Sequence, residues 1–273
     1  MRLSATRIST YRTCPRQYRY RYVDGLPTLM TAQLAFGRAI HETLGDLHQQ
    51  CVQSGRPLDI DHGIRAFRRR WWIVGAQEPA LFRDDARMRH AYRVLGEELL
   101  RGYVEEFRDR PLALAVEFPF TVHWGDEVLI GYVDRVDETE DGLEVREFKT
   151  GKRKPSRREV DEDLQLLLYS HGVGEVLGLP VRRAVYHHLR SATSLPTERE
   201  AETCRSQVND LLSRVVPAIR AGRHPPRNGW WCRFCDYRQM CEREGPEEMV
   251  MPPAPVCVSV PMKGDDVWPS QRP

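Results

Sequence analysis

The chain of 273 residues has no apolar run that approaches the roughly 20 residues needed to cross a membrane. Its first ten residues, MRLSATRIST, lack the apolar core of a signal peptide, so we expect a cytoplasmic protein. No G-x-x-x-x-G-K-[ST] loop is present, which excludes a P-loop ATP motor within this chain. The net charge is only +2, so an acidic partner would have to be bound by local basic patches.

Lysine is also scarce. Only four of the 41 basic residues are Lys, and a genome rich in G and C explains such a bias toward Arg. Three of the four nevertheless lie between residues 149 and 154. Because Lys, unlike Arg, is a compact and titratable cation, its retention there makes this stretch a candidate for a functional site.

An odd number of cysteines, seven, in a chain without a signal peptide argues against a disulfide framework. The group Cys232-x2-Cys235-x5-Cys241 instead has the spacing of metal ligands, and Cys14 is a candidate fourth ligand. Four thiolates suit structural zinc and an iron–sulfur cluster equally. Zinc ribbons, however, usually bring two Cys-x2-Cys pairs close together in the sequence, and here Cys14 is far from the other three.

The remaining composition is that of a globular protein, with 41% hydrophobic and 9% aromatic residues. Apolar residues recur at helical spacing in some stretches and alternate as in strands in others. We expect helices within 34–52, 64–107, 159–177 and 201–221, and strands within 113–123, 128–137, 143–148 and 181–189. The chain is rich in proline after Gly245, so we expect residues 245–273 to form a mobile tail.

Residues 1–22 contain six Arg, four Tyr and no acidic residue. Arg and Tyr together suit contacts with phosphates and stacking on bases, which makes Arg12, Arg16 and Tyr18 candidates for binding nucleic acid. The same composition also fits a helix with Tyr in the core and Arg in solvent, and composition alone favours this second interpretation.

Two acidic residues and a lysine fall on neighbouring strands of a predicted hairpin. Glu147 and Lys149 share a face of one strand, and Asp134 lies on the other. A two-residue turn at Asp141-Gly142 would make Asp134 the diagonal neighbour of Glu147, and a slightly longer loop would place the two directly opposite. Mg²⁺ or Mn²⁺ would relieve the repulsion between the carboxylates and activate water. Taken alone, such a hairpin is more often a solvated surface.

The residues that follow add two weaker signals. The stretch 152–158 has five basic residues among seven, including Lys152 and Arg153, which suits a polyanionic substrate or a flexible charged loop equally. Gln165 and Tyr169 are four residues apart and share a helix face, where they could contact a substrate or form ordinary helix surface.

Six short motifs occur in one order along residues 3–241: LSATRISTYRTCPRQYRYRY, FGRAIHETLG, IGYVDRVDE, VREFKTGK, QLLLY and CRFCDYRQMC. In this order they resemble the RecB-like branch of the PD-(D/E)XK nuclease superfamily. That branch includes the nuclease domains of RecB and AddB and the small CRISPR-adaptation nucleases. The resemblance implies an α/β fold with a central mixed sheet flanked by helices, a restriction-endonuclease-like core, an N-terminal helical part and a Cys-rich C-terminal segment.

The resemblance also implies roles for individual residues. His41, Asp134, Glu147 and the backbone carbonyl of Phe148 would hold Mn²⁺ or Mg²⁺. Asp134, Glu147 and Lys149 would be catalytic, with Glu147 in place of the commoner Asp. Gln165 and Tyr169 would steady the substrate or the active site. Glu117, on the preceding strand, is a candidate for the layer of residues around the metal ligands, although a structural role at the edge of the core is the more common one for such a Glu.

The Cys pattern is similar to that of the iron–sulfur members of the family. It implies a [4Fe–4S] cluster held by Cys14, Cys232, Cys235 and Cys241. Such a cluster would close a very long loop and join both ends of a single domain, residues 1–244. We expect it to be structural.

Together these features predict a metal-dependent DNA nuclease, an exonuclease directed to single strands or ends, acting in repair, recombination or CRISPR adaptation. A helicase or a CRISPR-adaptation protein is a possible partner, and no membrane association is expected. The alternative is a non-cleaving DNA-binding or assembly subunit of a helicase–nuclease or adaptation complex.

Overall fold

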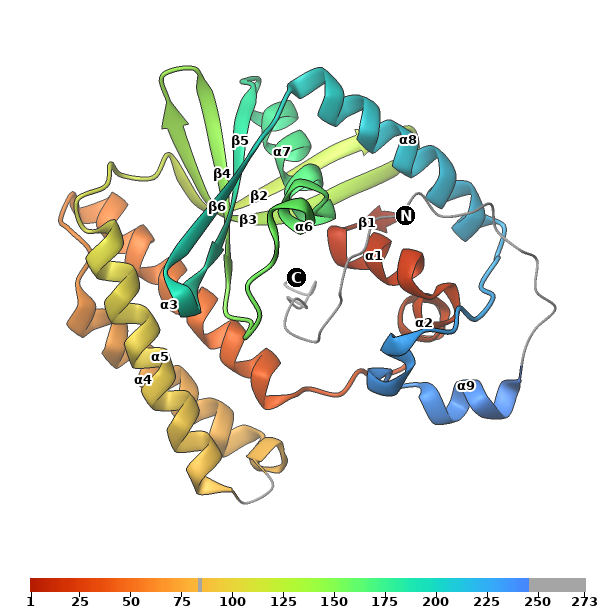
Figure 1. Cartoon of the computed structure of the whole chain (residues 1–273), viewed down its shortest axis with the longest axis horizontal. Helices are drawn as coiled ribbons and strands as arrows, with labels where there is room; N and C mark the ends of the chain where they lie inside the picture. The colour runs from red at the N-terminus through yellow and green to blue at the C-terminus, as the bar shows by residue number, and fades with distance from the viewer. Residues whose placement is uncertain (83–84, 246–273) are drawn as a thin grey trace.

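The computed structural model describes residues 1–82 and 85–245 as helices around one sheet (Figure 1). The proline-rich stretch predicted as a tail lies outside the described residues, apart from Gly245. No described helix is long and apolar enough to cross a membrane. The helices are α1 (Ala5–Thr13), α2 (Pro15–Tyr18), α3 (Ala32–Ser54), α4 (Ile60–Gln77), α5 (Ala86–Phe107), α6 (Arg157–Asp161), α7 (Leu164–Leu177), α8 (Ala201–Arg220) and α9 (Arg238–Glu244). Short π- and 3₁₀-helical turns are η1 (Arg19–Val23), η2 (Pro79–Phe82), η3 (Leu189–Ser191) and η4 (Trp230–Phe234).

The described residues form a mixed sheet of six strands. The strands are β1 (Arg2–Leu3), β2 (Ala115–Trp124), β3 (Glu127–Thr139), β4 (Gly142–Lys149), β5 (Val181–His188) and β6 (Thr193–Glu198). Their order is β1-β3-β4-β5-β6, and β2 also pairs with β3. The β1–β3 and β4–β5 pairs are parallel and the others antiparallel. This confirms the predicted α/β fold with a central mixed sheet, flanking helices and N-terminal helices, as in a restriction-endonuclease-like core.

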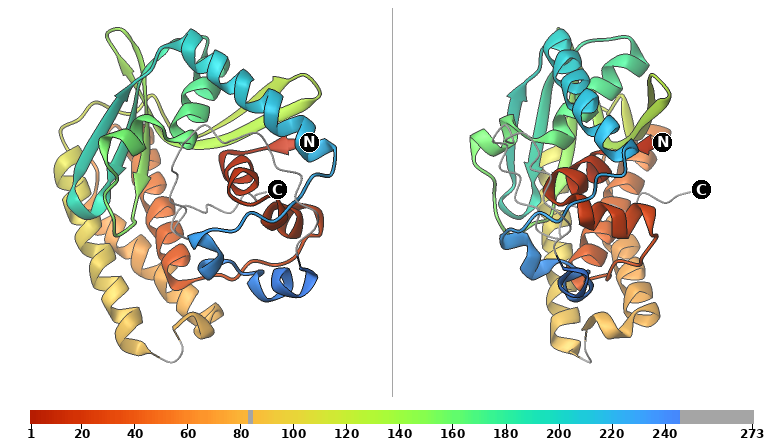
Figure 2. Two further views of the ribbon diagram at one scale, coloured as in Figure 1. Left: turned by 45° about the vertical axis from the view of Figure 1, so that its right-hand side comes forward. Right: turned by 90° about the vertical axis from the view of Figure 1, so that its right-hand side faces the viewer.

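Helices cover the two faces of the sheet with two separate cores (Figures 1 and 2). On one face α1, α7 and α8 pack on β3, β4 and β5 through aliphatic side chains such as Val133, Val145 and Leu168. On the other face α3, α4 and α5 form a core rich in aromatic rings, which also includes Phe148 of β4. Residues 143–149 of β4 are therefore buried, whereas the middle of β3 keeps exposed and partly exposed residues, Tyr132 among them.

The structure changes several predicted boundaries. The helix expected over 159–177 is divided, because the Asp163 side chain accepts from the Leu166 amide at 2.8 Å and begins α7 as an N-cap. The region 64–107 forms two helices, α4 and α5. Strand β6 and the two-residue β1 were not predicted.

The turn between β3 and β4 is Glu140-Asp141, one residue earlier than predicted, and Thr139 pairs with Gly142. Only glycine fits at 142: its φ is 147°, and a Cβ there would lie 2.4 Å from the Pro180 carbonyl oxygen. The earlier turn produces the register in which Asp134 and Glu147 are opposite one another. Of the two registers left open by the sequence, the one with Asp134 directly opposite Glu147 is observed, and it results from a two-residue turn at Glu140-Asp141 and not from a longer loop.

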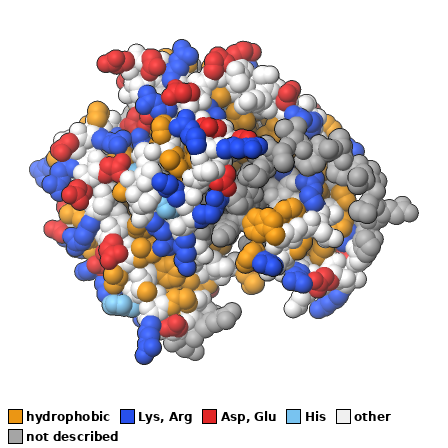
Figure 3. Space-filling model, in the orientation of Figure 1, with side chains coloured by type: hydrophobic (Ala, Val, Ile, Leu, Met, Phe, Trp, Pro, Cys, Tyr) orange, Lys and Arg blue, Asp and Glu red, His pale blue; other side chains and the backbone are white. Residues whose placement is uncertain are grey.

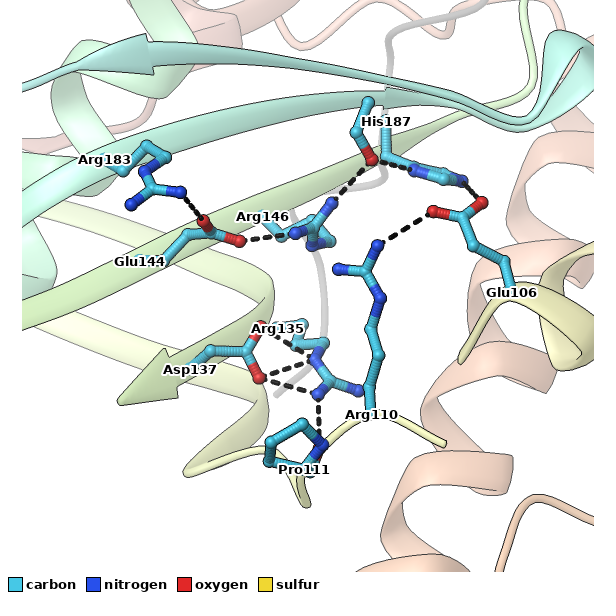
Figure 4. Close-up of polar contacts among 10 residues, drawn as sticks. Glu106, Arg110, Pro111, Arg135, Asp137, Glu144, Arg146, Arg183 and His187 are labelled. Carbon is cyan, nitrogen blue, oxygen red and sulfur yellow. Dashed lines mark hydrogen bonds and ion pairs between the residues drawn. The ribbon is translucent and has the colours of Figure 1, made fainter. Parts of the chain in front are cut away.

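Charged residues occupy the sheet face under α5, and all are paired (Figure 4). Arg135 is 3% exposed, binds Asp137 at 2.8 Å and donates to the Pro111 carbonyl at 2.9 Å. Arg146 is 4% exposed and pairs with Glu144. Buried charges are tolerated only when paired in this way, and the Arg135 bond to Pro111 joins β3 to the segment that follows α5. On the outer surface, basic and acidic side chains are intermixed over the face drawn in Figure 3.

The same network holds His48 of α3 in its neutral form. His48 is 3% exposed, contacts the Tyr103 hydroxyl and lies 3.2 Å from Arg135 Nη1. Burial, together with the Arg135 charge, lowers the pKa of His48 to about 3. An unfolded histidine has a pKa of about 6.5, so the stability that neutral His48 contributes is complete above that pH and is lost as the pH falls toward 3.

We therefore expect His48→Gln to reduce the loss of stability between pH 6.5 and 4. The slope of unfolding free energy against pH should become shallower by up to about 1.4 kcal/mol per pH unit, the value for one proton. Urea unfolding at several pH values measures this slope. His90→Gln, at an exposed position of α5, controls for the loss of a histidine. An unchanged slope in His48→Gln would show that His48 does not contribute to acid unfolding.

Candidate active site

The candidate residues meet where β3 and β4 diverge at the centre of the sheet. The last pair between these strands is Arg135–Arg146, and one further step in this register places Asp134 opposite Glu147. Beyond that pair the Asp134 carboxylate replaces a backbone partner: its Oδ2 accepts from the Phe148 amide at 2.7 Å. The divergence leaves two acidic residues side by side within the sheet.

Asp134 also reaches the helix that covers this point. Its Oδ1 lies 2.9 Å from Nδ1 of His41, which α3 presents to the sheet. Both side chains are 11% exposed. Helix α3 is placed by its own ends, because Thr31 caps it by accepting from the Leu34 amide and Gly55 ends it in the left-handed conformation.

Glu147, Lys149 and Gln165 form a second set of contacts on β4 and α7. The Lys149 Nζ lies 3.2 Å from Glu147 Oε1 and donates to Gln165 Oε1 at 2.8 Å. The Gln165 amide donates to Glu147 Oε1 at 2.9 Å and to the Tyr169 hydroxyl at 2.8 Å. Gln165 therefore bridges the carboxylate and the ammonium, and Tyr169 fixes the orientation of its amide. The structure brings together all six residues of this predicted centre.

Burial and mutual repulsion shift the titration of this centre. Burial, and then the neighbouring Asp134 charge, raises the pKa of Glu147 to about 8. Burial disfavours the charged form of His41, but Asp134, Glu147 and Glu117 outweigh it and raise its pKa to about 9. Two carboxylates this close to each other strongly favour a nearby cation.

The described residues contain no group of three or more His, Cys, Asp or Glu side chains arranged around a common point that could hold a metal ion. His41 and Asp134 instead bind each other, and Glu147 binds Lys149 and Gln165. The donor chemistry nevertheless fits a divalent cation of intermediate hardness, because it combines one imidazole with carboxylate oxygens.

The predicted substrate contacts at the N-terminus differ in exposure. Arg16 is fully buried, and its Nη1 donates to the Gly245 carbonyl at 2.5 Å. Tyr18 is 2% exposed and stacks on His224 with ring centroids 6.0 Å apart. A buried side chain cannot contact a strand of nucleic acid in this conformation, so the prediction that Arg16 and Tyr18 bind the substrate is wrong. The two side chains instead pack the N-terminal helices on the C-terminal segment. Arg12 is partly exposed.

The basic loop after β4 is partly neutralised by α6. Arg153 binds Glu159 at 2.6 Å, and Glu159 also forms a capping box with Ser156. Lys152 is exposed. The loop is therefore an ordered connection. Acidic residues of α6 neutralise part of the positive charge that the sequence predicts for it.

The four cysteines predicted as ligands come from two regions that lie side by side (Figures 1 and 2). Cys14 lies between α1 and α2 and accepts from the Arg227 amide at 3.4 Å. Burial, with smaller contributions from the neighbouring Cys14 and Cys232, raises the pKa of the Cys235 thiol to about 11. Cys241 lies on α9. The other cysteines are separate: Cys51 and Cys204 are buried elsewhere, and Cys257 lies outside the described residues.

Comparison with known proteins identifies the family. The model of the PD-(D/E)XK nuclease superfamily matches residues 2–242. The chain belongs to this superfamily. Its members are generally nucleases and typically use Mg²⁺ or Mn²⁺. The six residues that meet between β3, β4, α3 and α7 lie within the matched range.

Two individual proteins are also similar to the chain. The Gene 69 protein of Mycobacterium phage L5 is 20% identical over 287 residues, which cover 87% of this chain and 95% of that protein. A solved structure described as "Crystal structure of SSO0001" is 15% identical and has a TM-score of 0.37, with 88% of this chain and 85% of that one covered.

Removal of the bridging amide tests its structural contribution. Gln165→Ala removes the amide that bonds to both Glu147 and Lys149, and both of these residues are buried. We expect this change to lower the free energy of unfolding by about 1–3 kcal/mol, the usual cost of an unsatisfied buried polar group. Urea unfolding beside Gln207→Ala, an exposed glutamine of α8, measures the difference. Equal stability of the two variants would show that the bridge contributes nothing.

Proposed function

We propose that the protein is a metal-dependent deoxyribonuclease in which Asp134, Glu147 and Lys149 carry the reaction. The observation that supports this proposal best is their convergence at the point where β3 and β4 separate, with Lys149 held 3.2 Å from Glu147 and 2.8 Å from Gln165. Two carboxylates and a fixed ammonium in a superfamily of nucleases suit hydrolysis of a phosphodiester.

In this proposal His41, Asp134, Glu147 and the Phe148 carbonyl would hold Mn²⁺ or Mg²⁺. When bound, the cation would lower the pKa of a water molecule and withdraw charge from a phosphoryl oxygen. The pKa of about 8 at Glu147 supports this role, because the buried carboxylate lacks sufficient positive charge around it. Imidazole as one donor makes Mn²⁺ at least as acceptable as Mg²⁺.

Lys149 would act on the substrate directly. Its ammonium can donate to a phosphate oxygen or orient the attacking water while Gln165 holds its Nζ in place. Tyr169 supports this arrangement through its hydroxyl, which accepts from the Gln165 amide. We assign Gln165 and Tyr169 as positioning residues, because their contacts reach the reacting groups through Lys149 and Glu147.

For the substrate we propose DNA with a free end or a single-stranded region. Arg12, Lys152 and Arg153 are the predicted basic contacts that are exposed or partly exposed. The same proposal places the protein in the RecB-like branch and assigns it exonuclease action. It also includes a role in repair, recombination or CRISPR adaptation, with a helicase or an adaptation protein as partner.

We also propose that Cys14, Cys232, Cys235 and Cys241 hold a [4Fe–4S] cluster that joins both ends of one domain, residues 1–244. Cys14 and Cys232 lie close enough to act on Cys235. The Arg227 amide donates to Cys14 Sγ, the kind of bond that stabilises cluster sulfurs. The ends are also joined without a cluster, since Tyr237 donates to the Leu26 carbonyl at 3.0 Å and Arg19 binds Glu244 at 2.8 Å.

The nuclease proposal predicts that Glu147→Ala abolishes cleavage. With end-labelled single-stranded DNA and Mn²⁺, we expect the rate to fall by a factor on the order of 10² or more, because the variant loses a carboxylate next to the reacting phosphate. Glu138→Ala, which removes an exposed carboxylate from the same hairpin, should cleave as the unchanged protein does.

Equal cleavage by Glu147→Ala would show that the reactive centre is misassigned. DNA binding without cleavage by the unchanged, folded protein would instead support the non-cleaving subunit. The position of the label in the products reports the polarity of cleavage.

The cluster proposal predicts a brown protein with about four iron atoms and four sulfides per chain when it is purified without oxygen. Cys235→Ser should lose the visible absorbance and much of the soluble yield, whereas Cys204→Ser, at a buried cysteine of α8, should retain both. If the protein instead contains stoichiometric zinc and no iron, the cluster proposal is wrong and the four cysteines form a structural zinc site.

A further inference from the structure

The end of β5 lies beside the part of β4 that carries the candidate centre. In the parallel register of these strands, His188 is opposite Lys149. The ring of His187 packs on Phe148 with centroids 5.8 Å apart, on the face that α5 covers. Successive residues of a strand point to opposite faces, so His188 lies on the other face, together with Lys149. Neighbouring strands are only about 4.8 Å apart, so the residues that follow His188 are close to the centre.

Two side chains from this end of β5 bind the backbone directly after Lys149. The Nε2 of His188, a residue that is 2% exposed, donates to the Gly151 carbonyl at 2.8 Å. The Nε of Arg190 donates to the Thr150 carbonyl at 2.6 Å. Only Nε makes this bond, and the fork of a guanidinium has further N–H donors for a second partner. Arg190 is therefore held in place beside the reactive strand by one edge of its guanidinium.

The positive charge at this position is not neutralised by the protein. Burial lowers the pKa of the His188 imidazole, and the charges of Arg190 and Lys154 act in the same direction. Within residues 1–82 and 85–245, no carboxylate forms an ion pair with either of these two cations. Arg153, in contrast, is bound by Glu159. Lys154 is exposed and Arg190 partly exposed, so an anion from solution can reach both.

The chemistry of the two cations favours a phosphate as this anion. A guanidinium donates two parallel N–H bonds to a phosphate, and an ammonium adds a compact charge. Both cations lie near Lys149, which the proposed function places at the reacting phosphate. A nucleic-acid strand carries one phosphate per nucleotide, so a strand bound at Lys149 presents further phosphates nearby.

We propose that Arg190 and Lys154 form a phosphate subsite, which binds the DNA strand beside the phosphate that is cleaved. The inference rests on the proposed function, since the reactive centre defines which phosphate is cleaved. It adds contacts from the end of β5 and from the loop after β4 that the sequence motifs do not include.

Binding of fluorescently labelled single-stranded DNA, measured by anisotropy without a divalent cation, tests this subsite. The affinity is measured at several NaCl concentrations for Arg190→Gln, Lys154→Gln and Arg87→Gln, a control at an exposed position of α5. For a single strand, each phosphate contact contributes about 0.7 to the slope of log affinity against log salt concentration. We expect Arg190→Gln and Lys154→Gln each to weaken binding and to make this slope shallower by about 0.7. Arg87→Gln should leave the affinity and the slope unchanged.

Arg190→Lys distinguishes a phosphate contact from mere support of the loop. Lysine keeps the positive charge, so a phosphate subsite predicts a salt slope close to that of the unchanged protein. If Arg190→Lys and Arg190→Gln lose affinity equally and neither changes the slope, Arg190 acts only through the Thr150 carbonyl and the proposal is wrong. Lys154 is exposed, so Lys154→Gln still tests the subsite if Arg190→Gln fails to fold.

The outcomes also separate the subsite from the proposed function. If the unchanged protein binds single-stranded DNA and the slope is the same in Arg190→Gln and Lys154→Gln, the subsite is wrong and the nuclease proposal stands. If the unchanged protein does not bind single-stranded DNA at any salt concentration, the proposed substrate is wrong, and the subsite is wrong with it.

Discussion

The hydrogen bond between the Phe148 amide and the Asp134 carboxylate is the contact on which the site depends. Where β3 and β4 diverge, an amide that a neighbouring strand would normally satisfy needs another acceptor, because a buried and unpaired N–H is costly. Asp134 provides it at 2.7 Å and binds His41 with its other oxygen at 2.9 Å. One carboxylate thus joins β3, β4 and α3, and its charge remains inside the protein beside Glu147.

Alternation along the strands separates this site from the network that stabilises it. Successive residues of a strand point to opposite faces, and the chain uses both. Asp134 is followed by Arg135, and Glu147 is preceded by Arg146; the acids face the site and the arginines enter the buried network under α5 (Figure 4). Each arginine pairs with an acidic residue two positions away on its own strand, Asp137 or Glu144, so the buried network does not neutralise the acids of the site.

The two ends of the described chain are packed together. The Tyr11 hydroxyl donates to the Arg223 carbonyl at 2.7 Å, and Arg16 reaches Gly245 from the interior. These contacts place Cys14 beside the segment that contains Cys232 and Cys235. They also explain why a sequence pattern of Arg and Tyr typical of nucleic-acid binding is largely used for internal packing: Tyr11 and Tyr18 form an edge-to-face pair in the small core under α8.

Local patterns in the sequence determined much of the fold. Apolar periodicity placed the long helices and four of the strands, because burial of one face imposes that period on the residues. The order of the motifs predicts one site formed by His41, Asp134, Glu147, Lys149, Gln165 and Tyr169, and the structure brings these side chains together. Tertiary structure alone decided what depends on residues distant in the chain. The turn at Glu140 placed Asp134 opposite Glu147, and packing of the two ends buried Arg16 and Tyr18. No local pattern encodes these features, since each is determined by which segments meet and how closely they pack.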